Sequence, residues 1–393
     1  MTRRRLLRAF LLLPVAVALA AAWVALRDVP ELAVDQSAAA ADERPRGVFH
    51  VHSDSSHDGR TPASEQLAAA GRLGLDFVIF TEHDAQPVHG PPSVEPLAVP
   101  GTEWSTTYGH LIYLGYAEPP PPESESRARL QIGLVDSLRA RGALTILAHP
   151  ASPRRPWTGR LAGIGGLEIA STSSDARVKG DPLYALLPGL FALPFNRELA
   201  LAQLYRRDTA ALGMWDGLPD PRVIGMCGTD AHGWIDPEQN FRTWQIVFDS
   251  WDDAPDPLTS EAVVDRLSTG RFFCLAALLA EGAPDFSFRG VTVAGESVPT
   301  GATVADELIA ALEITTPRLA GQSEDVTDNA APTATTVLLR DGAEIARTSG
   351  RSLRHADPLP GTYRVEVRVR VPGVFFGGRD VPAVYSNRIR VIR

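Results

Sequence analysis

The sequence contains almost no lysine and very little sulfur. Lys179 is the only lysine among the 38 basic residues, and the 393 residues include two cysteines and three methionines. A cation in a binding site is therefore expected to be arginine, which holds phosphate or carboxylate through two parallel hydrogen bonds. Cys227 and Cys274 form no metal-type pair, so they are either two buried thiols or one disulfide.

The sequence also lacks an excess of positive charge. Its 47 acidic residues outnumber its 38 basic residues, which gives a net charge of −9. A polymeric nucleic acid is therefore not expected as a partner, since binding to phosphate backbones depends on basic surface. The hydrophobic content of 44% is sufficient for a packed core and excludes wholesale disorder.

Long apolar runs are rare, and the clearest one stands at the N-terminus. Four arginines within the first eight residues precede an apolar stretch at 9–26. This order is typical of an export signal, and the stretch is almost as long as the roughly 20 residues that span a bilayer. We predict that residues 1–26 are a cleaved signal peptide or a retained N-terminal membrane anchor, followed by a flexible linker at 27–46. Both alternatives place the protein outside the cytoplasm: periplasmic, secreted or anchored to the membrane with its catalytic domain outside.

From residue 47 to about 235, within a domain predicted to span residues 47–283, short apolar runs alternate with helix-like segments such as 63–73 and 125–141. This alternation predicts a parallel α/β sheet, open or closed, and seven strand candidates favour a barrel. A helical insertion is predicted at about 180–215, before the last strand of this domain. The candidate strands are 47–53, 76–84, 97–104, 109–116, 143–150, 166–171 and 222–232.

Residues 284–393 have a different character. Short segments with an apolar residue at every second position are separated by glycine and proline turns, and Asp341-Gly342 is typical of a hairpin turn. This pattern predicts an all-β, sandwich-like domain without obvious chemistry of its own.

Three of the nine histidines lie in the run GVFHVHSDSSHDG at 47–59. His50 and His52 are two residues apart on a predicted strand, so both side chains point to the same face. Asp58 follows in a turn. A pair of this kind is weak evidence alone, but further histidines and carboxylates fall at or near the ends of the other predicted strands: His83, Glu103, His110, His149, Asp230 and His232.

Imidazole and carboxylate ligands together suit Zn, Mn or Fe better than Ca or Mg alone. The nine candidates exceed the needs of one ion, so two or three divalent transition-metal ions are expected. His57 stands beside Asp58, and either side chain could reach the metal. Asp58 is the preferred candidate.

The motifs HVHSDSSHDG, FTEHD, GTEW, GHLIYLG, LAHP and GTDAH, in this order over residues 47–235, resemble the PHP (polymerase and histidinol phosphatase) family of metal-dependent phosphoesterases. The resemblance implies a distorted (β/α)7 barrel with a two- or three-metal site. It also implies that the nine residues named above are the ligands. The export signal and the sandwich-like domain set this chain apart from the polymerase-linked and histidinol phosphatase members, so neither of their substrates is carried over.

The expected reaction is hydrolysis of a small phosphate mono- or diester by a metal-bound hydroxide, with Asp230 or a nearby histidine such as His232 handling the proton. Arg154 and Arg155, on the loop after His149, are candidates for binding the phosphate. Two alternatives remain. The same site could hydrolyse a non-phosphate substrate, as amidohydrolases do, or the chain could be an exported binding module with an inactive barrel.

Overall fold

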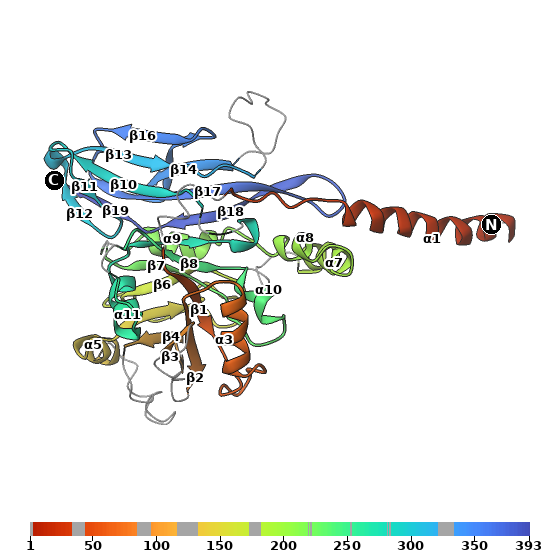
Figure 1. Ribbon diagram of the computed structural model, residues 1–393, viewed down its shortest axis with the longest axis horizontal. Coiled ribbons are helices and arrows are strands. Elements are labelled where there is room, and N and C mark those ends of the chain that lie inside the picture. Colours follow the sequence, from red (N-terminus) through yellow and green to blue (C-terminus); the bar gives the residue numbers. More distant parts are fainter. Residues whose placement is uncertain are drawn as a thin grey trace.

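The structure, a computed structural model, describes residues 3–33, 44–84, 96–115, 133–172, 182–218, 220, 222–251, 254–280, 282, 284–320 and 334–393. It is a mixed α/β protein with a large central sheet and a separate, smaller all-β sheet (Figure 1). Lys179 lies outside the described residues.

All seven strands predicted between 47 and 232 are present and are neighbours in the order of the chain. Their apolar runs are buried, and α3 (Ala63–Arg72) covers one face through Ala69 and Ala70. These strands are β1 (Arg46–Val51), β2 (Phe77–His83), β3 (Leu97–Thr106), β4 (Gly109–Leu114), β5 (Leu144–Ala148), β6 (Gly166–Ser171) and β7 (Ile224–Gly228).

The prediction of a parallel sheet is wrong for β4. This strand runs antiparallel to both β3 and β5, whereas the pairs β1–β2, β2–β3, β5–β6 and β6–β7 are parallel. Only residues 107 and 108 connect β3 to β4. A link of two residues closes a hairpin, because a parallel connection needs a crossover of a dozen residues or more.

The segment after β7 returns to β1 through backbone hydrogen bonds. The Thr229 amide donates to the Phe49 carbonyl at 2.9 Å, and the His52 amide donates to the Ala231 carbonyl at 3.0 Å. These hydrogen bonds connect the end of β7, the last strand of this region, to β1, the first strand.

The predicted helices are found where their segments are described. α3 (Ala63–Arg72) matches the segment predicted at 63–73, and α5 (Gly133–Ala140) covers the later half of the segment predicted at 125–141. A further helix, α11 (Ser260–Ser268), lies near the end of the predicted domain. The insertion is helical, and Asn196 and Asp208 cap its second and third helices by accepting backbone N–H groups. Its helices are α7 (Pro182–Ala192), α8 (Arg197–Ala202) and α9 (Thr209–Asp216); α10 (Pro237–Phe241) follows β7.

The central sheet continues from the α/β part into the C-terminal β part without a break. Strand β8 (Gln245–Phe248) pairs with β1, and β9 (Phe272–Leu275) pairs with both β8 and β18. The rest of this sheet contains β12 (Thr303–Ala305), β14 (Ala334–Arg340), β15 (Ala343–Thr348), β17 (Gly361–Pro372), β18 (Gly378–Ser386) and β19 (Ile389–Ile392).

The smaller sheet has the strand order β11–β10–β13–β16 and consists of β10 (Ser287–Thr292), β11 (Ser297–Val298), β13 (Ile309–Thr315) and β16 (Ser352–Ala356). The hairpin turn predicted at Asp341-Gly342 is confirmed. Both residues have positive φ, at 50° and 79°, and they connect β14 to β15.

The predicted flexible linker is partly wrong. Residues 34–43 lie outside the described residues, but Leu32 is fully buried and its amide donates to the Leu279 carbonyl. The preceding helix α1 (Arg3–Ala25) projects away from the rest of the molecule (Figure 1). Within the described part of the chain, none of the helices combines the length and the apolar character needed to cross a bilayer.

A disulfide and a set of hydrogen bonds join segments that are distant in the sequence. Cys227 in β7 and Cys274 in β9 form a buried disulfide, which settles the alternative left open by the sequence. The buried guanidinium of Arg388 donates to the carbonyls of Trp215, Asp220 and Val223, and so connects the β part to the segment after α9.

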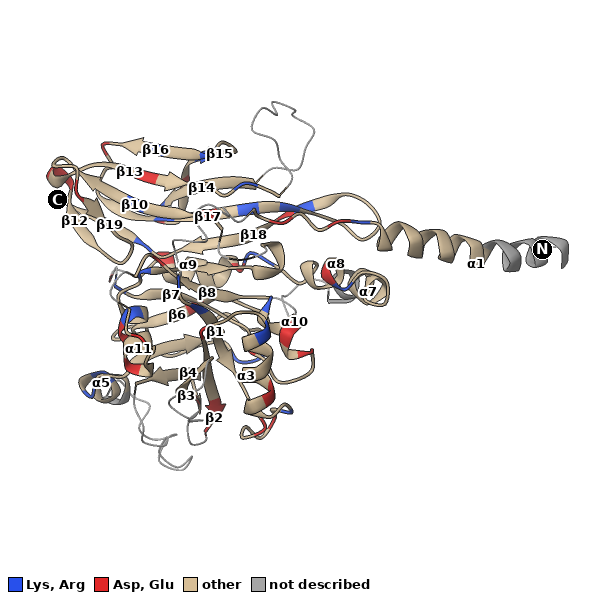
Figure 2. Cartoon of the chain, in the orientation of Figure 1, with Lys and Arg blue, Asp and Glu red and all other residues tan. Residues whose placement is uncertain are grey.

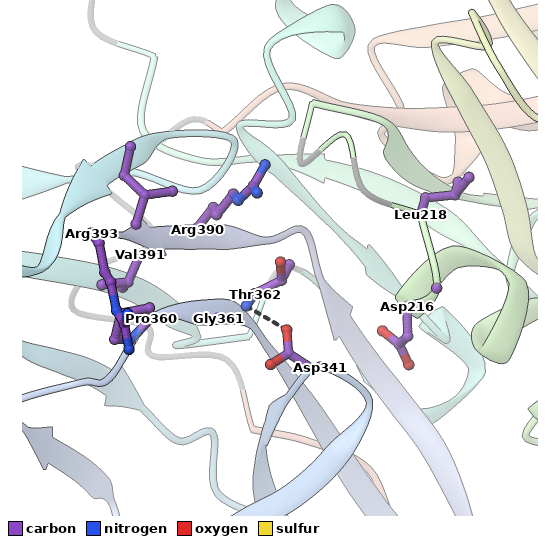
Figure 3. A pocket seen from close by; sticks show the side chains of 11 residues that line it. Asp216, Leu218, Asp341, Pro360, Gly361, Thr362, Arg390, Val391 and Arg393 are labelled. Atoms are coloured by element: carbon purple, nitrogen blue, oxygen red, sulfur yellow. Dashed lines mark hydrogen bonds between the residues drawn. The ribbon is translucent and has the colours of Figure 1, made fainter.

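A cavity of about 450 Å³ lies between the C-terminal end of α9 and the strands β17 and β19. Figure 3 shows Asp216 and Asp341 at this cavity, with the Asp341 carboxylate accepting the Thr362 amide at 2.8 Å. None of the nine candidate metal ligands lines it, so it is separate from the site described next.

Candidate metal centre

The structure brings all nine predicted ligands together at one rim of the α/β part. They form three overlapping groups in which the ligand atoms lie within 4.8 Å of one another. One group contains His52, Asp58, His83 and His232, a second contains His50, Glu103, His149 and Asp230, and a third contains His83, Glu103 and His110.

The antiparallel strand β4 explains how His110 reaches this rim. His110 is the second residue of β4 and pairs with Ser105 in β3 and Ala148 in β5. Because β4 runs opposite to its neighbours, the start of β4 lies beside their carboxyl ends.

Glu103 is the centre of the arrangement. Its Oε2 atom lies 2.9 Å from His50 Nε2, 3.1 Å from His52 Nε2 and 3.5 Å from His83 Nε2. Its Oε1 atom lies 2.6 Å from His110 Nδ1 and 3.1 Å from His149 Nε2. A fully buried carboxylate with imidazoles at both oxygens has the geometry of a bridge between two ligand groups.

Asp58 and Asp230 are the other two carboxylates, and each belongs to one of the two four-residue groups. Asp58 Oδ2 lies 3.1 Å from His232 Nε2 and 3.6 Å from His83 Nε2. Asp230 Oδ1 lies 3.4 Å from His50 Nε2 and 3.6 Å from His52 Nε2. His57 has a 73% exposed side chain and belongs to none of the three groups, so the geometry favours Asp58 over its neighbour.

The backbone is strained at the same residues. His50, His149 and Asp230 have positive φ angles of 67°, 29° and 50°, and Asp84, next to His83, has a φ of 48°. Positive φ is uncommon for residues other than glycine, costs about 1–3 kcal/mol, and concentrates at functional sites. Three of the four residues of one ligand group share this feature.

Glu168 in β6 orients two of the candidate ligands. Its Oε1 atom lies 2.7 Å from His50 Nδ1, and its Oε2 atom accepts the His149 amide at 2.6 Å. A carboxylate on the second ring nitrogen fixes the tautomer and orientation of a metal-binding histidine. Gly228 makes room for this carboxylate, because a Cβ atom there would collide with Glu168 Oε1.

Ser56 and Glu82 support the turn that carries Asp58. The Ser56 hydroxyl lies 3.2 Å from His52 Nδ1 and accepts the His83 amide at 2.8 Å. The buried Glu82 carboxylate accepts the Ser53 amide through both of its oxygens, at 3.0 Å and 3.1 Å. The C-terminal ends of β1 and β2 are therefore held together by side chains that do not belong to the ligand groups.

The charges in the centre are strongly coupled. Burial raises the pKa of Glu103, but His50, His110 and His149 outweigh this effect and hold that pKa well below its usual value. Burial likewise raises the pKa of Asp230, and His50, His52 and further histidines lower it well below the usual range. The centre therefore contains ionised carboxylates out of contact with bulk water, which require positive charge nearby.

The histidines are affected in opposite directions. Burial opposes a charge on His50, but Glu168, Glu103 and Asp230 raise its pKa well above the usual value. Burial lowers the pKa of His83 to about 4, with the attraction of Glu103 only partly opposing it. A neutral imidazole is the form that binds a metal ion.

The donor set fits divalent metal ions. His52 Nε2, Asp58 Oδ1, His83 Nδ1 and His149 Nδ1 are buried without a hydrogen-bond partner among the described residues. Buried polar atoms are normally satisfied, so such a concentration points to a bound species. Nitrogen and carboxylate oxygen atoms in these numbers are the ligands preferred by Zn, Mn and Fe.

The predicted phosphate-binding residues Arg154 and Arg155 are exposed on the loop between β5 and β6. Another exposed arginine, Arg60, has its guanidinium 3.2 Å from the ring centre of Trp234. In the sequence these two residues follow Asp58 and His232 by two positions.

Only one of these additional residues could be recognised from the sequence. Glu168 ends an apolar run and could be recognised as a candidate supporting residue. Arg60 and Trp234 lie in separate loops and become neighbours only when β7 returns to β1.

The comparisons with known proteins provide no family for the chain: no protein-family model matches it, and a search of curated proteins finds no match.

Proposed function

We propose that the protein is a metal-dependent hydrolase of small phosphate esters, built on a distorted seven-stranded barrel of PHP type. One observation carries this proposal: nine imidazole and carboxylate groups from separate strand ends, Glu103 among them, come together in three ligand groups, two of which share Glu103. The return of the chain from β7 to β1 supports the closed arrangement of strands.

Two or three divalent ions of Zn, Mn or Fe would be held by the three ligand groups, with Glu103 common to two of them. When bound, such ions activate water as a nucleophile and neutralise charge on the phosphoryl oxygens. Glu168 and Ser56 would help to position these ions by orienting the ligands. Glu168 faces His50 Nδ1, and Ser56 faces His52 Nδ1 and accepts the His83 amide.

Asp230 and His232 are the proposed proton-handling residues. Asp230 Oδ1 lies 3.6 Å from His52 Nε2 and 3.4 Å from His50 Nε2, so it is placed to orient a water molecule and accept its proton. His232 Nδ1 lies 2.9 Å from the Asp230 carbonyl, which holds the ring in position at the open side.

The substrate is proposed to enter where the centre is exposed. His50, His52 and Glu103 are completely buried, whereas the side chains of His110 and His232 are 13% exposed and that of Asp58 is 39% exposed. Arg60 is an exposed cation next to this opening, stacked on Trp234. A planar guanidinium there suits a phosphoryl oxygen of a small substrate.

The location outside the cytoplasm is part of the proposal. The order of four arginines and an apolar stretch at the N-terminus supports export. The Cys227–Cys274 disulfide supports it independently, because disulfides persist mainly in oxidising compartments.

The test is hydrolysis by the purified protein of phosphomonoesters, phosphodiesters, carboxylic esters and amides, with and without a chelator. We expect turnover of at least one class of phosphate ester, loss of that turnover with chelator and recovery with Zn, Mn or Fe. Hydrolysis of carboxylic esters or amides alone would favour the amidohydrolase alternative. Activity that is unaffected by complete metal removal would contradict both.

A further inference from the structure

A set of exposed apolar side chains surrounds the base of α1. We call this set the apolar collar. It comprises residues of α7 and the segment that follows it, together with one residue at the tip of the β17–β18 hairpin. The members and their exposed fractions are Leu187 (53%), Leu190 (61%), Leu193 (42%), Phe195 (43%) and Phe376 (90%).

The base of α1 is fixed to the same region. Val24 is fully buried, and the Asn196 side chain, which caps α8, donates to the carbonyls of Val24 and Arg27 at 3.2 Å and 2.7 Å. Arg27 also donates to the Gly373 carbonyl at the hairpin tip, at 2.5 Å. Figure 1 shows α7, α8 and the end of the β17–β18 hairpin gathered where α1 begins to project.

The collar is a single surface rather than scattered residues. Phe191 of α7 contacts Phe375 at the hairpin tip and Phe195 beyond α7, with ring centres 5.1 Å and 5.6 Å apart. Ten of the seventeen large apolar residues that are exposed in the described chain belong to the collar or to α1, and an eleventh, Leu26, follows α1 directly. A concentration of this kind marks an interaction surface.

The distribution of charged residues around the collar favours a lipid surface as its partner. Residues 9–26 and 182–196 contain no charged side chain, and Figure 2 shows the described part of α1 beyond its first residues without charge. Arg27 and the exposed Arg197 stand at the end of these segments, and Trp23 lies one turn before Arg27 with its indole N–H 3.3 Å from the Phe375 carbonyl. Apolar surface bordered by tryptophan and arginine is typical of a protein at the boundary between lipid headgroups and hydrocarbon.

We propose that the apolar collar rests on a lipid bilayer, with α1 entering the bilayer from the centre of the collar. Because α1 is fixed to the domain at its base, a membrane that contains α1 must also meet α7 and the hairpin tip. The collar side chains would then lie about 5–10 Å deep, at the level between headgroups and acyl chains. The bilayer would hold the domain in one orientation, with α1 and the collar as two contacts.

The experiment uses single introduced cysteines in the full chain, since Cys227 and Cys274 are buried in a disulfide and do not compete for the label. Leu190→Cys and Phe376→Cys carry an environment-sensitive fluorophore in the collar. Leu359→Cys is the matched control, because Leu359 in the β part is 61% exposed, as Leu190 is. The protein is reconstituted into phosphatidylcholine–phosphatidylglycerol vesicles with and without a spin-labelled lipid.

We expect the probes at 190 and 376 to emit at shorter wavelength in vesicles and to be quenched by the spin-labelled lipid, while the probe at 359 remains unchanged. A vesicle-bound protein whose probes at 190 and 376 still report water would contradict the proposal, as would a chain that does not bind vesicles. A shift that appears without vesicles and grows with protein concentration would overturn it in favour of a second copy of the chain. None of these readings depends on catalysis.

Discussion

At the scale of single residues, the candidate metal centre was predictable because metal binding depends on the types of the ligand residues and on their positions at strand ends. Histidine and carboxylate residues at the ends of short apolar runs can only gather if those ends share a rim. All nine predicted ligands lie together, and Asp58 rather than His57 takes part. Arg60 was missed because its neighbour Trp234 is far away in the sequence, and Arg154 and Arg155 were chosen from loop position alone.

The first residue-scale prediction concerns Glu168. Replacing it as Glu168→Gln keeps the size of the side chain but removes the charge that faces His50 Nδ1. We expect metal affinity to fall about 10–100-fold, because outer carboxylates of this kind orient the ligand histidines. Competition with a chromophoric chelator measures the affinity.

The matched control for this variant is Glu313→Gln, since among the described residues Glu313 pairs with two exposed arginines of the β part, Arg289 and Arg354. Equal metal affinity in wild type, Glu168→Gln and Glu313→Gln would show that Glu168 has no orienting role.

A second residue-scale prediction concerns Arg60. If its guanidinium binds the phosphoryl group of the substrate, Arg60→Ala should raise KM about tenfold or more and leave the metal content unchanged, since a charge-assisted hydrogen bond contributes about 1.5–3 kcal/mol. Steady-state kinetics with a phosphate ester provide the measurement. Arg289→Ala, in the exposed pair with Glu313, is the control for loss of a surface arginine. An unchanged KM would remove Arg60 from the substrate site.

At the scale of elements, the apolar runs located the strands well, but they did not give the direction of β4. Strand direction follows from the length of the connection, and the two residues between β3 and β4 permit only a hairpin. The linker at 27–46 was predicted to be flexible from its content of Ala, Asp and Glu. Its described start is docked by the buried Leu32 and by backbone hydrogen bonds of residues 31–33.

Strand β17 carries a buried ionic network, from which we predict how the stability of the fold depends on pH. Arg207 and Arg364 donate to the Glu366 carboxylate at 2.8 Å and 2.7 Å, and Arg364 also holds Asp216 at the end of α9 through two hydrogen bonds. Burial raises the pKa of Glu366, but the hydrogen bonds and charges of these arginines outweigh it and lower that pKa to about 2.

A carboxyl group whose pKa is lower in the folded protein stabilises the fold at pH values above its unfolded pKa and loses this contribution as the pH falls. We therefore expect the free energy of unfolding to decrease by about 3 kcal/mol for this group between pH 5 and pH 2. Denaturant unfolding at several pH values measures it. The Glu366→Gln variant should be less stable at pH 7 and should lose less stability on acidification. Parallel pH profiles for wild type and variant would contradict this assignment.

At the scale of the whole molecule, composition indicated two kinds of structure, but it did not reveal how they are connected. The all-β character after residue 284 was predicted from alternation along the strands. The pairing of β18 with β9, and of β9 with β8, joins the two parts in one sheet. Such long-range pairing depends on tertiary contacts that leave no local signal in the sequence.

The disulfide strengthens this connection, because it links β7, next to Asp230, with β9, which pairs with the β part. The closed loop spans a sequence separation of 47 residues. A loop of that length predicts that the Cys227→Ala, Cys274→Ala double variant loses about 4 kcal/mol of stability through the greater entropy of its unfolded chain. Equilibrium unfolding monitored in both parts gives the value. A double variant as stable as the wild type would show that the disulfide adds nothing to the fold.

The most direct test of the central claim is the metal content of the purified protein, measured by mass spectrometry of the elements after growth with Zn, Mn and Fe. The convergence of ligand groups on Glu103 predicts at least two transition-metal ions per chain, and a loss of metal in a folded Glu103→Gln variant. A folded wild-type protein that retains no metal, or a Glu103→Gln variant that retains all of it, would contradict the account.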